Sequence, residues 1–110
     1  MANLPRVVSA IITLQHLISM TTARRYLVSG KVQGVGFRFF TEDAARREGL
    51  TGFVRNLDDG RVEAVVVGEK ESIARFERSL GVGPPLSRVT DISIEMEPPV
   101  TGLIGFQIHE

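Results

Sequence analysis

The fold prediction rests on the segment Gly30-Lys31-Val32-Gln33-Gly34-Val35-Gly36-Phe37-Arg38. An apolar run over residues 26–32 leads into it, and residues 39–47 have the composition of a helix. The predicted order is therefore strand, glycine turn and helix. Glycine permits positive φ, and the first turn of a helix leaves amide N–H groups unpaired and carries partial positive charge. Together these features predict a cup that binds an anion.

Arg38 lies at the mouth of this predicted cup. Its planar guanidinium offers a fork of donors that suits two phosphate oxygens at once. Two better-known phosphate motifs are absent, because the dinucleotide fingerprint needs a glycine at Phe39 and the Walker motif needs one at Val35. Gly34 and Gly36 by themselves would fit a plain tight turn equally well, and that remains the alternative. With Arg38 beside them, we expect a phosphate-binding loop of another kind. Its members are Gln33, Gly34, Val35, Gly36, Phe37 and Arg38.

A second stretch, Gly52-Phe53-Val54-Arg55-Asn56-Leu57-Asp58-Asp59-Gly60-Arg61-Val62, stands at a suitable distance from the first. The two stretches together resemble the paired signature of the acylphosphatases, and the resemblance runs from about residue 24 to the C-terminus. It implies that Arg38 binds the phosphoryl group and that Asn56 positions the attacking water. It also implies a fold in which the first loop lies beside the strand end that carries Asn56. From the residues alone, an asparagine before a turn would be expected to bond only to its own backbone.

The rest of the chain predicts an α+β domain of the ferredoxin-like βαββαβ type. Strands are expected at residues 25–32, 51–55, 61–67, 90–96 and, as a short last strand, 105–109, and helices after the glycine loop to residue 47 and at 69–80. Asp59-Gly60 between two apolar runs indicates a hairpin. The expected architecture is a sandwich of one antiparallel sheet with two helices on one face. Inward-facing helix residues are predicted to be Phe37, Phe40, Ala44, Ile73, Phe76 and Leu80.

Composition limits the possible functions. The 110 residues carry no net charge and no cysteine, so binding of nucleic acid or of an acidic membrane is not favoured, and disulfides and thiolate chemistry are excluded. His16 and His109 lie far apart without partners at metal spacing. We expect no metal, no cofactor and a cytoplasmic location, which a chain without cysteine suits.

Residues 1–19 differ in composition from the rest of the chain and are interpreted as an N-terminal extension, either an amphipathic helix or a dispensable segment. A secretory leader is the alternative, but Gln15 and His16 interrupt its apolar run. The acylphosphatase-like domain is predicted to span residues 20–110, with Met20 as a possible initiator.

An acyl phosphate is the substrate that asks least of such a sparse site. When the bond to phosphorus breaks, the acyl group leaves as a carboxylate. The conjugate acid of this leaving group has a pKa of about 4, so no general acid is needed. The predicted reaction is hydrolysis of an acyl phosphate to a carboxylate and inorganic phosphate, by a monomer that phosphate inhibits. One alternative is a non-catalytic, small-ligand or RNA-binding module of ferredoxin-like fold. Another is an acylphosphatase-like domain that handles carbamoyl phosphate within a larger protein.

Overall fold

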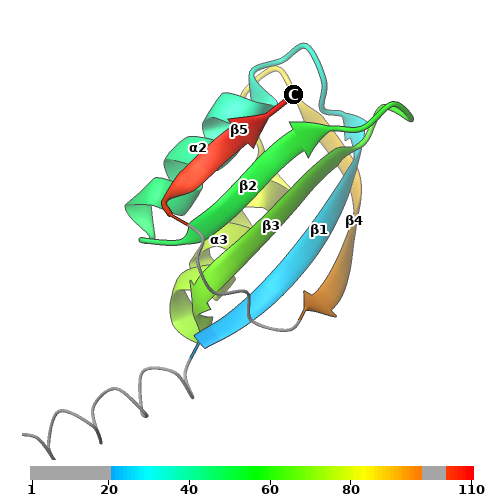
Figure 1. The fold of residues 1–110 in the computed structure, drawn as a ribbon. Coiled ribbons are helices and arrows are strands. Elements are labelled where there is room, and N and C mark those ends of the chain that lie inside the picture. Colours follow the sequence, from blue (N-terminus) through cyan, green and yellow to red (C-terminus); the bar gives the residue numbers. More distant parts are fainter. Residues whose placement is uncertain (1–20, 98–103) are drawn as a thin grey trace, which may run out of the picture.

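The computed structural model describes residues 21–97 and 104–110. Its elements are β1 (Thr21–Lys31), α2 (Phe37–Arg47), β2 (Thr51–Asn56), β3 (Val62–Glu69), α3 (Lys70–Val82), β4 (Arg88–Glu97) and β5 (Phe106–His109). Both helices pack on one face of a single sheet (Figure 1). The predicted α+β ferredoxin-like fold is thus confirmed. The interpretation of residues 1–19 falls outside the described residues.

The sheet has five strands in the order β4-β1-β3-β2-β5. The first four pair antiparallel, and β1 lies in the interior between β4 and β3. The expectation of a wholly antiparallel sheet is corrected at β5, which pairs parallel to β2 from Gly52↔Phe106 to Arg55↔His109. The terminal strand therefore lies at the edge opposite β4, although it follows β4 in the chain. The end of the third strand also differs from the prediction of residue 67, because β3 continues through Gly68 to Glu69, which pairs with Thr21.

The core lies between the sheet and the helices. Alternate residues of the central strands, such as Tyr26 and Val66, are fully buried there. Phe76 of α3 packs its ring 5.7 Å from that of Tyr26 and 6.5 Å from that of Phe106. The buried Tyr26 hydroxyl donates to Glu77 at 3.0 Å, and burial followed by the Glu77 charge raises the pKa of Tyr26 well above its usual value. All the predicted inward helix residues are buried except Phe40, which is half-buried.

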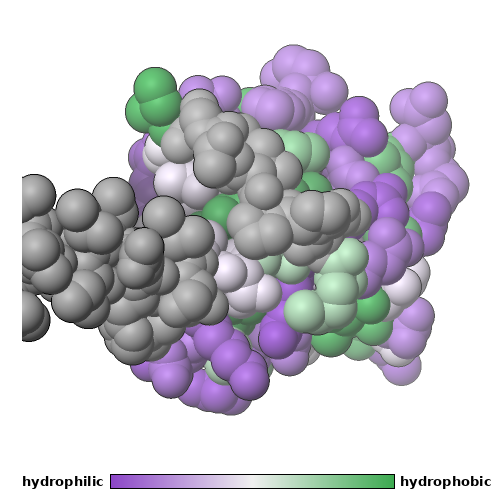
Figure 2. Space-filling model, turned by 60° about the horizontal axis from the view of Figure 1, so that its bottom comes forward, coloured by the Kyte–Doolittle hydropathy of each residue, from purple (hydrophilic) through white to green (hydrophobic). Residues whose placement is uncertain are grey.

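The strand predicted at residues 90–96 is present as β4, but not all of its apolar residues reach the core. Val89 and Ile92 pack against the core, whereas Ile94 is 47% and Met96 69% exposed. The reason is that β4 is an edge strand, beyond the part of the sheet that the helices cover (Figure 1). Hydrophilic side chains make up much of the surface visible in Figure 2, with apolar residues interspersed. Within the described ranges, the large exposed apolar side chains are Phe39, Val82, Leu86, Ile94, Met96 and Ile104.

Candidate active site

The loop between β1 and α2 owes its form to two glycines. Gly34 and Gly36 have φ of 74° and 79°, values at which a side chain would be strained. Gly36 caps α2 without a side-chain hydrogen bond, and its carbonyl accepts the first helical bond from the Phe40 amide at 3.0 Å. The backbone N–H groups of residues 34–39 donate no hydrogen bond to residues 21–97 or 104–110. The loop therefore offers a row of free donors at a helix N-terminus, as the sequence predicted.

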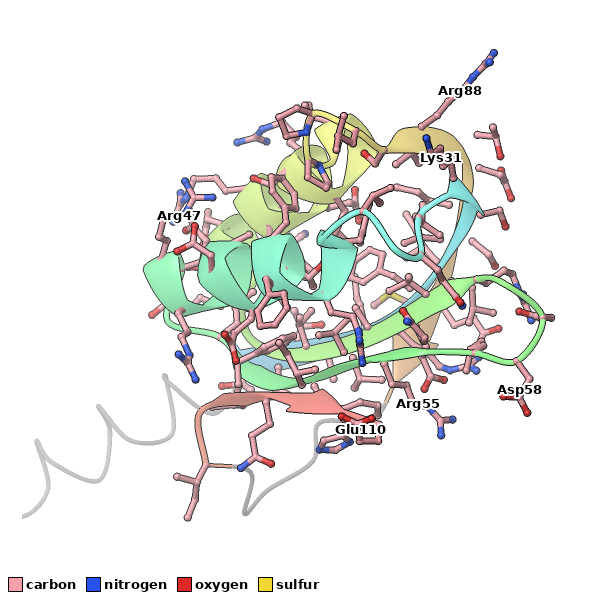
Figure 3. The ribbon with its side chains drawn as sticks, turned by 90° about the horizontal axis from the view of Figure 1, so that it is seen from above. Lys31, Arg47, Arg55, Asp58, Arg88 and Glu110 are labelled. Carbon is pink, nitrogen blue, oxygen red and sulfur yellow. The ribbon has the colours of Figure 1, made fainter. Side chains whose placement is uncertain are left out.

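A pocket of about 220 Å³ opens at this loop. The β1–α2 loop and the turn between β2 and β3 lie at the same end of the molecule, which Figure 3 views from above. The pocket is thus lined from both sides, by Arg38 of α2 and by Asn56 at the end of β2. The sequence implied this juxtaposition only through its resemblance to a family. The full lining consists of Val32, Gly34, Gly36, Phe37, Arg38, Phe39 and Asn56.

Arg38 carries a positive charge that no described residue neutralises, at the N-terminus of a helix. The side chain is half-buried, and within the described ranges it makes no hydrogen bond or ion pair. Arg25 and Arg55, in contrast, both donate to Glu63 at 2.6 Å. Arg38 is also the second residue of α2, where the helix dipole repels a cation. A bound anion would relieve this repulsion and use the free amides beside it.

Asn56 is the last residue of β2, and its side chain lines the pocket. Its Oδ1 atom is buried and has no hydrogen-bond partner among the described residues. A buried acceptor without a partner costs about 1–3 kcal/mol, so it is normally satisfied by water or ligand. The local turn uses Asp59 instead, whose carboxylate accepts from the Arg61 amide at 3.0 Å. Asn56 is therefore not explained by turn chemistry, whereas Asp59 is.

Gln33 and Val35 lie outside the pocket lining. Val35 packs partly against the core. The Gln33 side-chain amide donates to the Leu57 carbonyl at 2.8 Å and to the Arg61 carbonyl at 3.0 Å. Those two residues close the β2–β3 turn through a bond from the Leu57 amide to the Arg61 carbonyl. Gln33 thus ties the β1–α2 loop to the hairpin that carries Asn56, a role that nothing in the sequence pattern indicated.

Sequence reasoning also missed a charge cluster on the sheet face opposite the helices. The Glu63 side chain is only 4% exposed and accepts from Arg25 and Arg55 on the two flanking strands. Burial raises the pKa of this carboxyl, but the bonds from Arg55 and Arg25 outweigh it, so the pKa lies below its usual 4.5. Arg55 precedes Asn56 and projects to the other face (Figure 3). The cluster therefore anchors the strand end that carries Asn56.

The histidines and carboxylates of the described part of the chain do not form a second candidate site. No three His, Cys, Asp or Glu side chains gather there as a metal site would require. The His109 ring stacks on Phe53, with centroids 4.6 Å apart, and His16 lies outside the described ranges. Asp59 pairs with Arg61 at 2.8 Å, and these hydrogen bonds lower the pKa of its carboxyl. Among the helices described, none is long and apolar enough to cross a membrane.

The fold is that of a small α+β domain, with a pocket at the N-terminus of its first described helix. The model of the acylphosphatase family matches residues 24–108. An acylphosphatase of Trichormus variabilis is 51% identical over 81 residues, which cover 74% of this chain and 79% of that protein. The chain belongs to the acylphosphatase family.

Solved structures agree with this assignment. Acylphosphatase from Bacillus subtilis matches with a TM-score of 0.78 and 39% identity, over 81% of this chain and 99% of that chain. Full-length HypF, in its phosphate- and nucleotide-bound form, matches with a TM-score of 0.73 and 30% identity. That match covers 82% of this chain but only 12% of HypF.

Proposed function

We propose that the pocket is the active centre, with the β1–α2 loop and Arg38 holding the phosphoryl group and Asn56 orienting the attacking water. As a member of its family the chain is an acylphosphatase, a hydrolase of acyl phosphates. The observation that carries the proposal is the presence of two unsatisfied groups in one pocket. They are the Arg38 guanidinium and the buried Asn56 Oδ1, neither of which has a partner among the residues that the structure describes. The first is complementary to an anion, and the second to a water O–H.

The reaction needs positioning and charge stabilisation more than acid–base chemistry. The free amides of the loop and the Arg38 guanidinium bind the nonbridging phosphoryl oxygens, whose charge they stabilise in the transition state. A water that donates to Asn56 Oδ1 attacks phosphorus in line with the acyl oxygen. The new P–O bond forms as the bond from phosphorus to the acyl oxygen breaks, and its electron pair leaves on the carboxylate. The proton of the water passes to a phosphoryl oxygen, which yields inorganic phosphate.

The two roles are separable by kinetics. Purified protein would be assayed with benzoyl phosphate, with inorganic phosphate as a competitive inhibitor. Arg38→Ala should lower kcat/KM by about 10²–10³-fold, because one charged donor is lost, and should also weaken inhibition by phosphate. Asn56→Ala should lower kcat by a similar factor while the inhibition constant for phosphate stays within about twofold, because phosphate binding needs no attacking water.

Matched controls are available among exposed residues outside the pocket lining. Arg88→Ala removes an exposed arginine that forms no ion pair within the described residues, and Gln107→Ala removes an exposed carboxamide. Both variants should keep wild-type kinetics, and thermal unfolding would confirm that all four variants fold. Retention of more than about a third of the activity in Arg38→Ala or Asn56→Ala would remove that residue from the mechanism.

The non-catalytic module remains distinguishable by experiment. Such a module would bind inorganic phosphate without hydrolysing benzoyl, acetyl or carbamoyl phosphate. The zero net charge of the chain supports our proposal that nucleic acid is not a partner. A fluorescence titration with single-stranded RNA that showed salt-sensitive, tight binding would contradict it.

We also propose that the chain acts as a cytoplasmic monomer and that residues 1–19 are dispensable. The family match begins at residue 24, which supports a catalytic domain within residues 20–110. A variant that starts at Met20 should equal the full chain in kcat/KM and in unfolding temperature. Size-exclusion chromatography with light scattering checks the monomer, and cell fractionation checks the compartment. A loss of activity on truncation would assign the extension a role.

A further inference from the structure

Phe39 is an aromatic side chain that the core does not use. It is 68% exposed, whereas its neighbour Phe37 is buried and makes the ring contact with Phe40, at 6.1 Å. No aromatic ring within the described residues stacks on Phe39. Of the large apolar side chains exposed in those ranges, Phe39 alone lines the pocket that contains Arg38 and Asn56. Packing therefore does not explain this residue.

The position of Phe39 directs it toward the site. It is the third residue of α2, directly after Arg38. Side chains on a helix lean toward its N-terminus and cover the preceding turn. The ring therefore leans over the end of α2 where the glycine loop presents its amides, and it forms part of the rim of the pocket.

The lining residues are of two chemical kinds. The loop amides, the Arg38 guanidinium and the Asn56 carboxamide are polar and suit a phosphoryl group and a water. The remaining side chains, those of Val32, Phe37 and Phe39, are hydrocarbon, and no carboxylate or second cation lines the pocket within the described residues. Whatever extends from the phosphoryl group therefore meets apolar atoms.

The size of the pocket determines where the acyl group lies. Its volume of about 220 Å³ is below the roughly 300–1,000 Å³ of common ligand pockets. Once a phosphoryl group occupies the loop, the acyl group has to extend to the rim. Phe39 is the large side chain at that rim, and an acyl group against its ring would cover apolar surface that water now contacts.

We propose that Phe39 recognises the acyl group and makes the enzyme prefer acyl phosphates with an aromatic or extended apolar acyl group over acetyl phosphate. This inference rests on the proposed function of the pocket. Benzoyl phosphate represents the preferred class, because its ring can stack on or meet the edge of the Phe39 ring. Acetyl phosphate carries only a methyl group, which is too small to gain from the same contact.

The test compares KM for both substrates in the wild type and in Phe39→Ala, Phe39→Tyr and Ile104→Ala. Phe39→Ala should raise KM for benzoyl phosphate about fivefold and leave KM for acetyl phosphate and the inhibition constant for phosphate within about twofold. Phe39→Tyr keeps the ring and should retain wild-type values. Ile104→Ala, a control, removes an exposed apolar side chain near the opposite end of β2 and should change neither KM.

The outcomes separate this inference from the function on which it rests. Hydrolysis of both substrates with equal KM, or an unchanged KM for benzoyl phosphate in Phe39→Ala, would overturn the acyl-recognition role and leave the hydrolase intact. A parallel rise in both KM values would assign Phe39 to the shape of the phosphate loop instead, and would likewise overturn the proposal. Failure of the wild type to hydrolyse either substrate would overturn both.

Discussion

The side-chain amide of Gln33 provides the most direct test of how the two halves of the site are held together. It donates both of its hydrogens to carbonyls of the β2–β3 turn, at 2.8 Å to Leu57 and at 3.0 Å to Arg61. The Gln33→Ala substitution removes both donors without altering the glycines that shape the loop. The structure thus predicts a loss of stability together with a loss of alignment.

The two bonds set the magnitude of the effect. A neutral hydrogen bond contributes about 1 kcal/mol net, so the variant should lose about 2 kcal/mol of unfolding free energy. For a domain of this size that corresponds to a fall of roughly 8–16 °C in unfolding temperature. Urea unfolding and calorimetry measure these quantities. Gln107→Ala, which removes an exposed glutamine, should stay within about 0.5 kcal/mol of the wild type.

The kinetic consequence is separate. Gln33 joins the loop that contains Arg38 to the hairpin that follows Asn56, so its removal should lower kcat for benzoyl phosphate by about tenfold even at temperatures where the variant is fully folded. Gln33→Glu should be worse, because a carboxylate cannot donate to two carbonyls and would be repelled by them. A Gln33→Ala protein with wild-type stability and kcat would refute the role we assign to this contact.

Two further predictions concern backbone strain and acid stability. Gly52 has φ of 140°, and a Cβ there would overlap the Val65 carbonyl oxygen, so Gly52→Ala should lose about 4 kcal/mol or more. At Gly36 the space is open although φ is 79°, so Gly36→Ala should lose only about 1–2 kcal/mol; equal losses in urea unfolding would contradict this reasoning. The lowered pKa of Glu63 means that its ionised form stabilises the fold above about pH 4.5 and that this contribution disappears as the pH falls through the lowered pKa. Glu63→Gln should therefore be less stable than the wild type at pH 7 and lose less on acidification, and parallel stability–pH curves for the two proteins would show that Glu63 contributes nothing.

Local residue patterns were enough to place the elements and to predict a glycine turn before α2. Residue periods of two and of about 3.6 depend only on neighbours along the chain, so they located the strands and helices to within a few residues. Gly34 and Gly36 predicted a left-handed turn before a helix for the same local reason. The two motifs around Arg38 and Asn56 were also recognisable from the sequence alone. That both residues line one pocket was implied only by the resemblance to a family.

The features that depend on strand order and register became visible only in the packed fold. Hydrophobic alternation does not encode strand direction, so the parallel pairing of β5 with β2 was not predictable from it. The exposure of Ile94 and Met96 results from the edge position of β4, which no local pattern reveals. The ties from Gln33 to the hairpin and from Glu63 to its two arginines join residues on different elements. Such contacts depend on how the strands are ordered, and that order is set by packing of the whole core.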